Sequence, residues 1–198
     1  MKVTHHDGSV TMTDIYGQNV SRVEEGNNVF QQYGFIPIFK PDLQVGRFQF
    51  EHFEMLFGSQ DVAMSQEEIA KYQITHVVNL VSSIITCNLK VQYLALNLYD
   101  DDQEDLIPAL QKIVPFLNGL PTASTVFIHC NAGKSRAPSI VTGCLILLKG
   151  MTFEDAYHEV REQRPSSSIN TNFKQQLQDL SQSSIIKRAV LDMSENTC

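Results

Sequence analysis

The sequence TVFIHCNAGKSR, residues 125–136, begins with a short apolar segment and is followed by a longer one. The short segment, residues 125–128, is as expected for a buried strand. The longer apolar segment, residues 140–148, ends before Gly150, a common helix stop. The eight residues at 129–136 are mostly polar. The pattern therefore predicts a strand, a tight loop and a helix, and ligands bind at such junctions in open α/β sheets.

The composition of this loop favours the binding of a phosphate. Its backbone N–H groups can converge on an anion, and the dipole of the following helix adds favourable potential. Ala132 and Gly133 leave room for close backbone approach, while Arg136 offers a planar fork for two phosphate oxygens. The same field should favour the thiolate form of Cys130, which is the nucleophilic form.

Two other interpretations of the loop are weaker. Gly133-Lys134-Ser135 resembles the end of a nucleotide-binding P-loop, but the first glycine of that motif would fall at Ile128. A buried cysteine is usually only a small packing residue, yet that role does not explain a glycine-containing polar loop with arginine six positions later. Cys144 lies in the apolar helix and is expected to pack, and Cys87 is expected to be inert unless it protects an oxidised Cys130.

Strand and helix patterns alternate along the rest of the chain, which predicts an α/β domain with a largely parallel central sheet flanked by helices. Strands are expected at 45–50, 53–57, 74–81, 91–98 and 125–128. Helices are expected from Ser65, over 106–117, over 140–148, from Thr152 to about 163, and from Asn170 as the last one. Pro115 should kink the second of these helices or end it early. We expect an N-terminal arm at 1–37, poorly ordered or loosely docked, a catalytic domain at 38–184 and a tail at 185–198.

The overall composition excludes several classes of protein. A net charge of −7 argues against a general nucleic-acid binder, and no apolar run reaches the ~20 residues that span a bilayer. The four cysteines form neither a CxxC pair nor a metal-ligand spacing, so we expect neither a disulfide framework nor a zinc site. The N-terminus lacks an apolar signal region, which favours a cytoplasmic location, with the nucleus as a second compartment.

From about Pro41 to Ser181 the sequence resembles the atypical dual-specificity protein phosphatases, whose signature is HCx5R. Within them it is most similar to the subgroup that regulates the stress-activated protein kinase pathway. The matching segments are 41–46 (PDLQVG), 58–61 (GSQD), 74–77 (ITHV), 129–137 (HCNAGKSRA) and 164–166 (RPS). The resemblance implies hydrolysis of phosphotyrosine and phosphoserine/threonine through a phosphocysteine intermediate, with no metal and no cofactor.

The resemblance also implies roles for individual residues. Cys130 is the nucleophile and Arg136 binds the phosphate. The family places its general acid after a strand with the pattern Tyr-x-x-Ile/Leu-x-x-x-Asp, and residues 93–100 (YLALNLYD) fit with Asp100 as the acid. Asp101 and Asp102 are its neighbours in the loop. The other residues expected around the phosphate are His129, which should hold the loop and favour the thiolate, and Asn131, Ala132, Gly133, Lys134 and Ser135.

The sequence departs from the family pattern at three positions. Ala137 replaces the usual Ser or Thr after the arginine, so we expect modest turnover. Ile169 and Asn172 replace the usual Pro and Gly around Asn170, which weakens the expected start of the last helix without affecting the chemistry.

Other functions stay open. The expected partners are phosphorylated proteins, including MAP kinases of the JNK pathway or their upstream kinases, and the oligomeric state is unknown. A phosphoinositide phosphatase is disfavoured, since Asn131 stands where such enzymes usually carry a second basic residue. An RNA 5′-triphosphatase is disfavoured by the negative charge. A weakly active scaffold that binds phosphoproteins of a kinase pathway is an alternative of another class.

Overall fold

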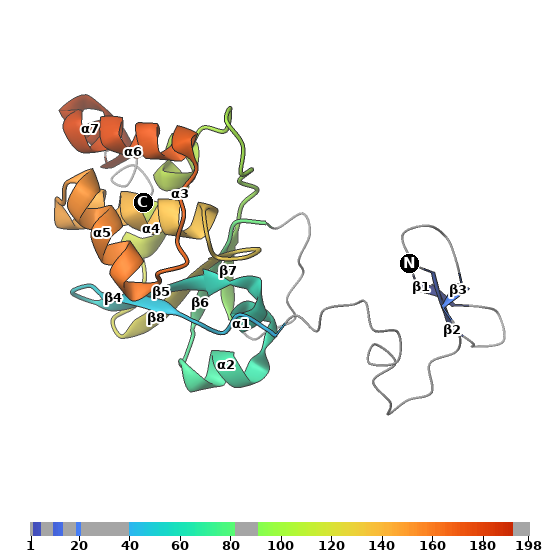
Figure 1. Cartoon of the computed structure of the whole chain (residues 1–198). Coiled ribbons are helices and arrows are strands. Elements are labelled where there is room, and N and C mark those ends of the chain that lie inside the picture. Colours follow the sequence, from blue (N-terminus) through green and yellow to red (C-terminus); the bar gives the residue numbers. More distant parts are fainter. Residues whose placement is uncertain (1, 5–9, 14–18, 21–39, 82–90, 192–198) are drawn as a thin grey trace. The chain divides into compact units, whose positions relative to one another are not determined.

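The computed structural model describes residues 2–4, 10–13, 19–20, 40–81 and 91–191. The chain divides into two compact units, Met1–Lys40 and Pro41–Cys198. In the first unit, strands β1 (Lys2–Thr4), β2 (Val10–Thr13) and β3 (Asn19–Val20) form an antiparallel sheet in the order β1-β2-β3 (Figure 1). The sequence analysis predicted no strands in the arm at 1–37, which contains all three. The other residues of this arm lie outside the described part of the chain.

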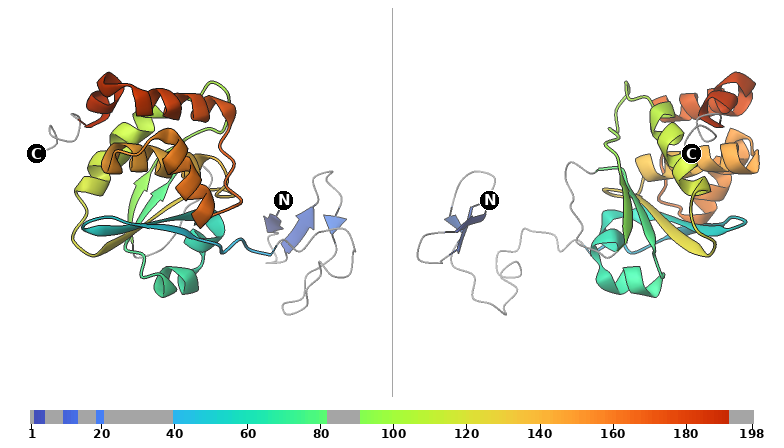
Figure 2. Two further views of the ribbon diagram at one scale, coloured as in Figure 1. Left: turned by 60° about the vertical axis from the view of Figure 1, so that its left-hand side comes forward. Right: turned by 180° about the vertical axis from the view of Figure 1, so that it is seen from behind.

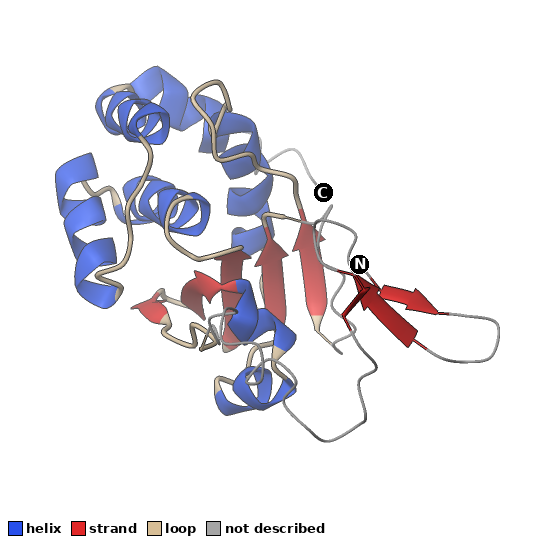
Figure 3. Ribbon diagram, turned by 45° about the vertical axis from the view of Figure 1, so that its right-hand side comes forward, coloured by secondary structure: helices blue, strands red, loops and turns tan. Residues whose placement is uncertain are grey.

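The second unit is built on a five-stranded sheet in the order β4-β5-β8-β6-β7. Figure 3 draws the strands in red, next to the helices that pack on them. The strands are β4 (Gly46–Gln49), β5 (Phe53–Ser59), β6 (His76–Asn79), β7 (Gln92–Ala95) and β8 (Ser124–Cys130). Strands β5, β8, β6 and β7 are parallel, and only β4 runs antiparallel, at one edge. The predicted largely parallel α/β sheet is confirmed.

Helices cover both faces of this sheet (Figures 1 and 2). The helices are α1 (Gln60–Met64), α2 (Gln66–Lys71), α3 (Ile107–Asn118), α4 (Arg136–Lys149), α5 (Phe153–Gln163), α6 (Thr171–Gln182) and α7 (Ser184–Leu191). Helices α3–α7 share the larger apolar core with one sheet face, and α1 and α2 form a smaller core on the other. None of the helices in the described ranges is long and apolar enough to cross a bilayer.

Strand β8 lies at the centre of the sheet and is buried along its whole length. Val126 and Ile128 pack into the larger core, whereas Phe127 packs into the smaller one, as the alternation of side chains along a strand requires. A parallel strand covered on both faces must be apolar throughout, which explains the uninterrupted run that begins at Val126. The strand ends at Cys130, which pairs with Ser59 at the carboxyl edge of the sheet.

Most helix boundaries follow from local sequence signals. Ser65, Thr152 and Asn170 each cap the helix that follows, and Gly150 ends α4 in the left-handed conformation at φ = 68°, as predicted. Pro115 lies inside α3 and does not end it, because the helix continues to Asn118.

Two helices were not foreseen. Helix α1 is a single turn that Ser59 caps directly after β5. Helix α7 occupies residues that the sequence analysis counted as tail, and its Val190 is fully buried in the larger core. Residues 192–198 of the expected tail lie outside the described part of the chain.

Candidate active site

The loop between β8 and α4 lies at the carboxyl edge of the sheet. Cys130 is the last residue of β8 and is 1% exposed, and Arg136 is the first residue of α4. Ser135 occupies the N-cap of α4 without a capping hydrogen bond from its side chain. The amides of Arg136 and Ala137, in the first turn of this 14-residue helix, are thus left available to a ligand at the end where the helix dipole favours an anion.

The backbone carbonyls along the loop all accept hydrogen bonds, at 2.7–3.4 Å. For the carbonyls of residues 129 to 135 the donors are, in order, Leu80 N, His129 Nδ1, Gln60 N, Arg164 Nη2, Arg164 Nε, Ser168 N and Ser139 N. Five of these seven donors come from outside the strand–loop–helix segment. The segment is therefore held in shape by residues that are far away in the sequence.

These bonds also set the direction of the loop amides. In a trans peptide the N–H points opposite to the C=O of the preceding residue, and no cis peptide bond occurs in the described residues. When the carbonyls of residues 130–135 bond to surrounding groups, the amides of residues 131–136 are turned the other way. Within the described ranges none of these six amides donates a hydrogen bond to the protein. Such a set of unpaired amides is an anion-binding arrangement.

Gly133 is required for this shape. Its φ of +63° lies in the left-handed region, and a Cβ atom at this position would stand 2.3 Å from the carbonyl carbon of Gly58. The loop thus packs directly on the backbone at the end of β5. No other residue can occupy this position without moving the loop.

His129 contacts the loop through its buried side chain. Its ring is buried, stacks on Phe127 at 5.8 Å and contacts the carbonyl of Cys130 through Nδ1 at 3.4 Å. Burial lowers the pKa of His129 from 6.5 to about 4. The imidazole is therefore neutral at physiological pH, so it acts on the loop through its position and hydrogen bond and not through a positive charge.

Asp100 is the one carboxylate of residues 100–102 whose side chain reaches the loop. Its Oδ1 accepts hydrogen bonds from Ser135 Oγ at 2.8 Å and from Asn170 Nδ2 at 2.7 Å. Asp101 instead caps its own turn, where its Oδ1 accepts from the amides of Gln103 and Glu104. This placement favours Asp100 over its neighbours as the proton donor.

Arg136 lies beside Asp100 at the start of α4. Its Nη1 donates to the carbonyl of Leu98 at 3.2 Å, and its Nε is 3.9 Å from Asp100 Oδ2. Among the described residues Nε has no hydrogen-bond partner although it is buried. A buried donor without a partner is costly, so this N–H is available to a phosphate oxygen.

Side chains of α6 hold the segment that carries Asp100. These contacts were not predicted from the sequence. Asn172 Nδ2 donates to the carbonyls of Asp101 and Glu104, and Gln176 Nε2 donates to the latter as well. Asn172 is the residue that departs from the glycine of the family pattern. Asn170, expected only as a helix cap, caps α6 through Oδ1 and holds Asp100 through Nδ2.

The other features do not extend the site. Burial raises the pKa of the Cys144 thiol to about 12, which agrees with the packing role predicted for it. Cys87 lies outside the described residues, so its suggested protective role stays a prediction.

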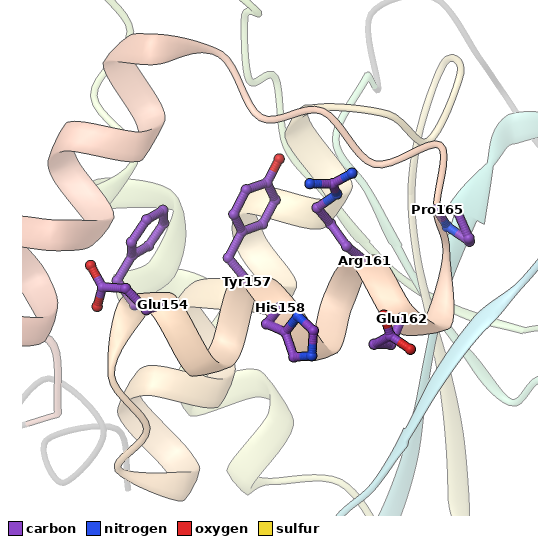
Figure 4. Close-up of a pocket in the computed structure, with 7 residues that line it drawn as sticks. Glu154, Tyr157, His158, Arg161, Glu162 and Pro165 are labelled. Atoms are coloured by element: carbon purple, nitrogen blue, oxygen red, sulfur yellow. The ribbon is translucent and has the colours of Figure 1, made fainter.

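A hollow of about 540 Å³ runs along α5, and Figure 4 shows its side chains on successive turns with Pro165 beyond the helix end. It is lined by none of the residues predicted for the phosphate site.

Together these groups can bind and attack a phosphate ester. The loop amides and Arg136 offer donors for one anion, Cys130 lies at the start of the loop, and Asp100 places a carboxyl against Ser135 of the loop. A thiolate in such a setting is a nucleophile, and a nearby carboxyl can protonate a leaving oxygen.

Comparison with known proteins gives a consistent result. The family described as "Dual specificity phosphatase, catalytic domain" matches residues 55–183. Dual specificity protein phosphatase 19 of Mus musculus is 32% identical over 146 residues, which are 73% of this chain and 65% of that relative. Dual specificity protein phosphatase 1 of Arabidopsis thaliana is 30% identical over 131 residues, 65% of this chain and 66% of that relative. The chain thus spans slightly less than two thirds of these curated relatives.

A solved structure supports the fold. The Yvh1 phosphatase domain from Chaetomium thermophilum superposes with a TM-score of 0.61 at 23% identity, over 68% of this chain and 93% of that one.

The neutral state of His129 predicts a pH-dependent stability. With a folded-state pKa of about 4 against 6.5, the unfolded chain binds more protons between these values. Stability must therefore rise with pH across that window, and His129 alone should account for a loss of about 2 kcal/mol between pH 7 and pH 5. Urea unfolding at both pH values should show a difference smaller by this amount in His129→Gln. An identical pH dependence in both proteins would contradict the assignment.

Proposed function

The chain belongs to the dual specificity phosphatase family, and from this premise we propose that it hydrolyses phosphotyrosine and phosphoserine/threonine in proteins. The proposal rests above all on the loop of residues 130–136, whose carbonyls are bonded to surrounding groups so that its amides are left for a phosphate. It further rests on Asp100, whose carboxyl accepts a hydrogen bond from Ser135 of the loop and can therefore serve the leaving group.

In the first step of the proposed mechanism, the phosphate binds to the amides of residues 131–136 and to Arg136. The thiolate of Cys130 attacks phosphorus, so that an S–P bond forms while the bond to the side-chain oxygen breaks. Asp100 transfers its proton to this oxygen, and the protein hydroxyl leaves. The positive groups around the loop stabilise the charge on the transferring phosphoryl group.

In the second step, water attacks the phosphocysteine. Asp100, now a carboxylate, accepts a proton from this water as the S–P bond breaks. Inorganic phosphate leaves, and the Cys130 thiolate and protonated Asp100 are restored. All atoms and electrons are supplied by substrate, water and these two residues, so the proposed cycle runs without a cofactor.

We further propose that the substrates are kinases of the stress-activated MAP kinase pathway, including the JNK pathway, in the cytoplasm and the nucleus. Support comes from the segments 41–46, 58–61 and 164–166, which resemble the subgroup that regulates this pathway. Doubly phosphorylated JNK should lose phosphate faster than an equally phosphorylated kinase of the growth-factor branch. Equal rates on both kinases would contradict the pathway assignment but leave the phosphatase activity intact.

The roles of Cys130 and Asp100 predict a characteristic pattern of rates. The purified chain should release phosphate from 4-nitrophenyl phosphate, and Cys130→Ser should abolish this. Asp100→Asn should lower turnover of phenyl phosphate by about 10²-fold but affect 4-nitrophenyl phosphate much less, because the better leaving group needs little protonation. Asp101→Asn and Asp102→Asn are the matched controls and should match the unmodified chain.

Two outcomes would count against the proposal. An unmodified chain that binds phosphopeptides tightly without turnover would favour the scaffold. A leaving-group effect in Asp101→Asn or Asp102→Asn, and not in Asp100→Asn, would move the proton donor.

Ala137 predicts a gain of activity on substitution. It directly follows Arg136 in α4 and is fully buried. A hydroxyl at this position can donate a hydrogen bond to the sulfur and ease departure of the thiolate from the phosphocysteine, so Ala137→Ser should increase kcat several-fold. Steady-state kinetics on 4-nitrophenyl phosphate measure the change. Unchanged kcat in a folded Ala137→Ser protein would remove this explanation for modest turnover.

A further inference from the structure

Arg164 is the most deeply buried charged side chain near the loop. It follows the last turn of α5, and its side chain is 0% exposed. Burying a guanidinium is costly unless its charge is paired and its N–H groups are bonded. Arg164 meets both conditions. It takes no part in the steps described above, so its burial needs another explanation.

All five N–H groups of this guanidinium have acceptors. Nε donates to the carbonyl of Gly133 at 3.0 Å, and Nη2 donates to that of Ala132 at 3.1 Å. Nη1 donates to the carbonyl of Gln44 at 2.5 Å and to Asp42 Oδ1 at 3.3 Å, and Nη2 also pairs with Asp42 Oδ2. One planar group therefore joins the loop to the segment 42–44.

Asp42 is itself held on three sides. Its carbonyl accepts from Ser59 Oγ at 2.8 Å, its amide donates to Asp61 Oδ2 at 2.8 Å, and its Oδ1 accepts from the amide of Gln44 at 3.2 Å. Burial alone would raise the pKa of Asp42, but the hydrogen bonds and charge of Arg164 outweigh it and keep the pKa below its ordinary value. The carboxylate is thus a fixed anionic partner for the guanidinium.

We infer that Arg164, oriented by Asp42, is a positioning residue that fixes two peptide planes of the phosphate-binding loop. The carbonyls of Ala132 and Gly133 belong to the same peptide units as the amides of Gly133 and Lys134. Holding both carbonyls toward the guanidinium turns both amides toward the site. Hydrogen bonds from a charged donor also polarise these peptide units, which makes their N–H groups stronger donors to an anion.

This inference deepens the proposed function and rests on it for the identity of the anion. Arg164→Lys keeps the charge, but an ammonium is a single point and cannot reach both loop carbonyls and both acceptors in 42–44. Arg164→Met keeps a similar length without any donor. Both variants should leave the two peptide planes free to rotate. The matched control is Arg161→Lys, an exposed arginine on α5.

The experiment uses the full chain and tungstate, a phosphate-shaped anion, measured by calorimetry at a temperature where circular dichroism shows each variant folded. Arg164→Lys and Arg164→Met should weaken tungstate binding by about tenfold or more, on the scale of losing oriented hydrogen bonds to a charged ligand. The pH midpoint for alkylation of Cys130 by iodoacetamide, followed by peptide mass spectrometry, should rise in both. Arg161→Lys should change neither quantity.

Equal tungstate affinity and an equal alkylation midpoint in folded Arg164 variants would overturn the inference and leave Arg164 a structural residue. Where these variants do not fold, Asp42→Asn is measured in the same way, because it keeps one oxygen toward Arg164 but removes the negative charge and the second acceptor. An unchanged affinity there would also overturn it. The outcome does not depend on turnover: failure of the proposed function would appear as an inactive unmodified chain, whatever the tungstate result.

Discussion

The site depends on one constraint, which is that a peptide unit cannot turn its C=O and its N–H to the same side. Each carbonyl from Cys130 to Ser135 is bonded to a side chain or to backbone around the loop, so each following amide is presented to the opposite side. Because these amides are already oriented, anion binding does not have to order them, and no free energy is lost in doing so. Cys130 begins the loop that carries them, and Arg136 with the first turn of α4 ends it.

Three separate parts of the chain outside the loop contribute to this constraint. The segment at Asp42 binds Arg164, and Arg164 binds the loop. At the junction of β5 and α1, the amide of Gln60 donates to the carbonyl of Asn131, and Gly133 packs on the backbone at Gly58. These parts coincide with segments 41–46, 58–61 and 164–166, which sequence resemblance had grouped with the loop without a physical reason. The structure shows that they meet at the loop.

The sequence was most informative where local chemistry determines structure. The apolar run before Cys130, the caps at Ser65, Thr152 and Asn170, and the stop at Gly150 are all found as predicted. The contacts that hold the loop could not be predicted, because they join residues as far apart as Asp42 and Arg164. The three adjacent aspartates likewise left the proton donor ambiguous, and only the positions of Ser135 and Asn170 distinguish Asp100. Helix α7 was missed although its own sequence is amphipathic, with Ile186, Val190 and Leu191 packed in the larger core beside α3 and α6.

The most direct test of the central claim is an NMR titration of the ¹⁵N-labelled full chain with inorganic phosphate. If the loop amides form the anion site, the resonances of residues 131–136 should shift together and saturate, with the largest changes at Gly133 and Lys134. The resonances of the amides along α5, beside the hollow lined by Tyr157 and Arg161, should not shift. Saturable shifts along α5 with unmoved loop amides, or no saturable shift in the loop, would contradict the account.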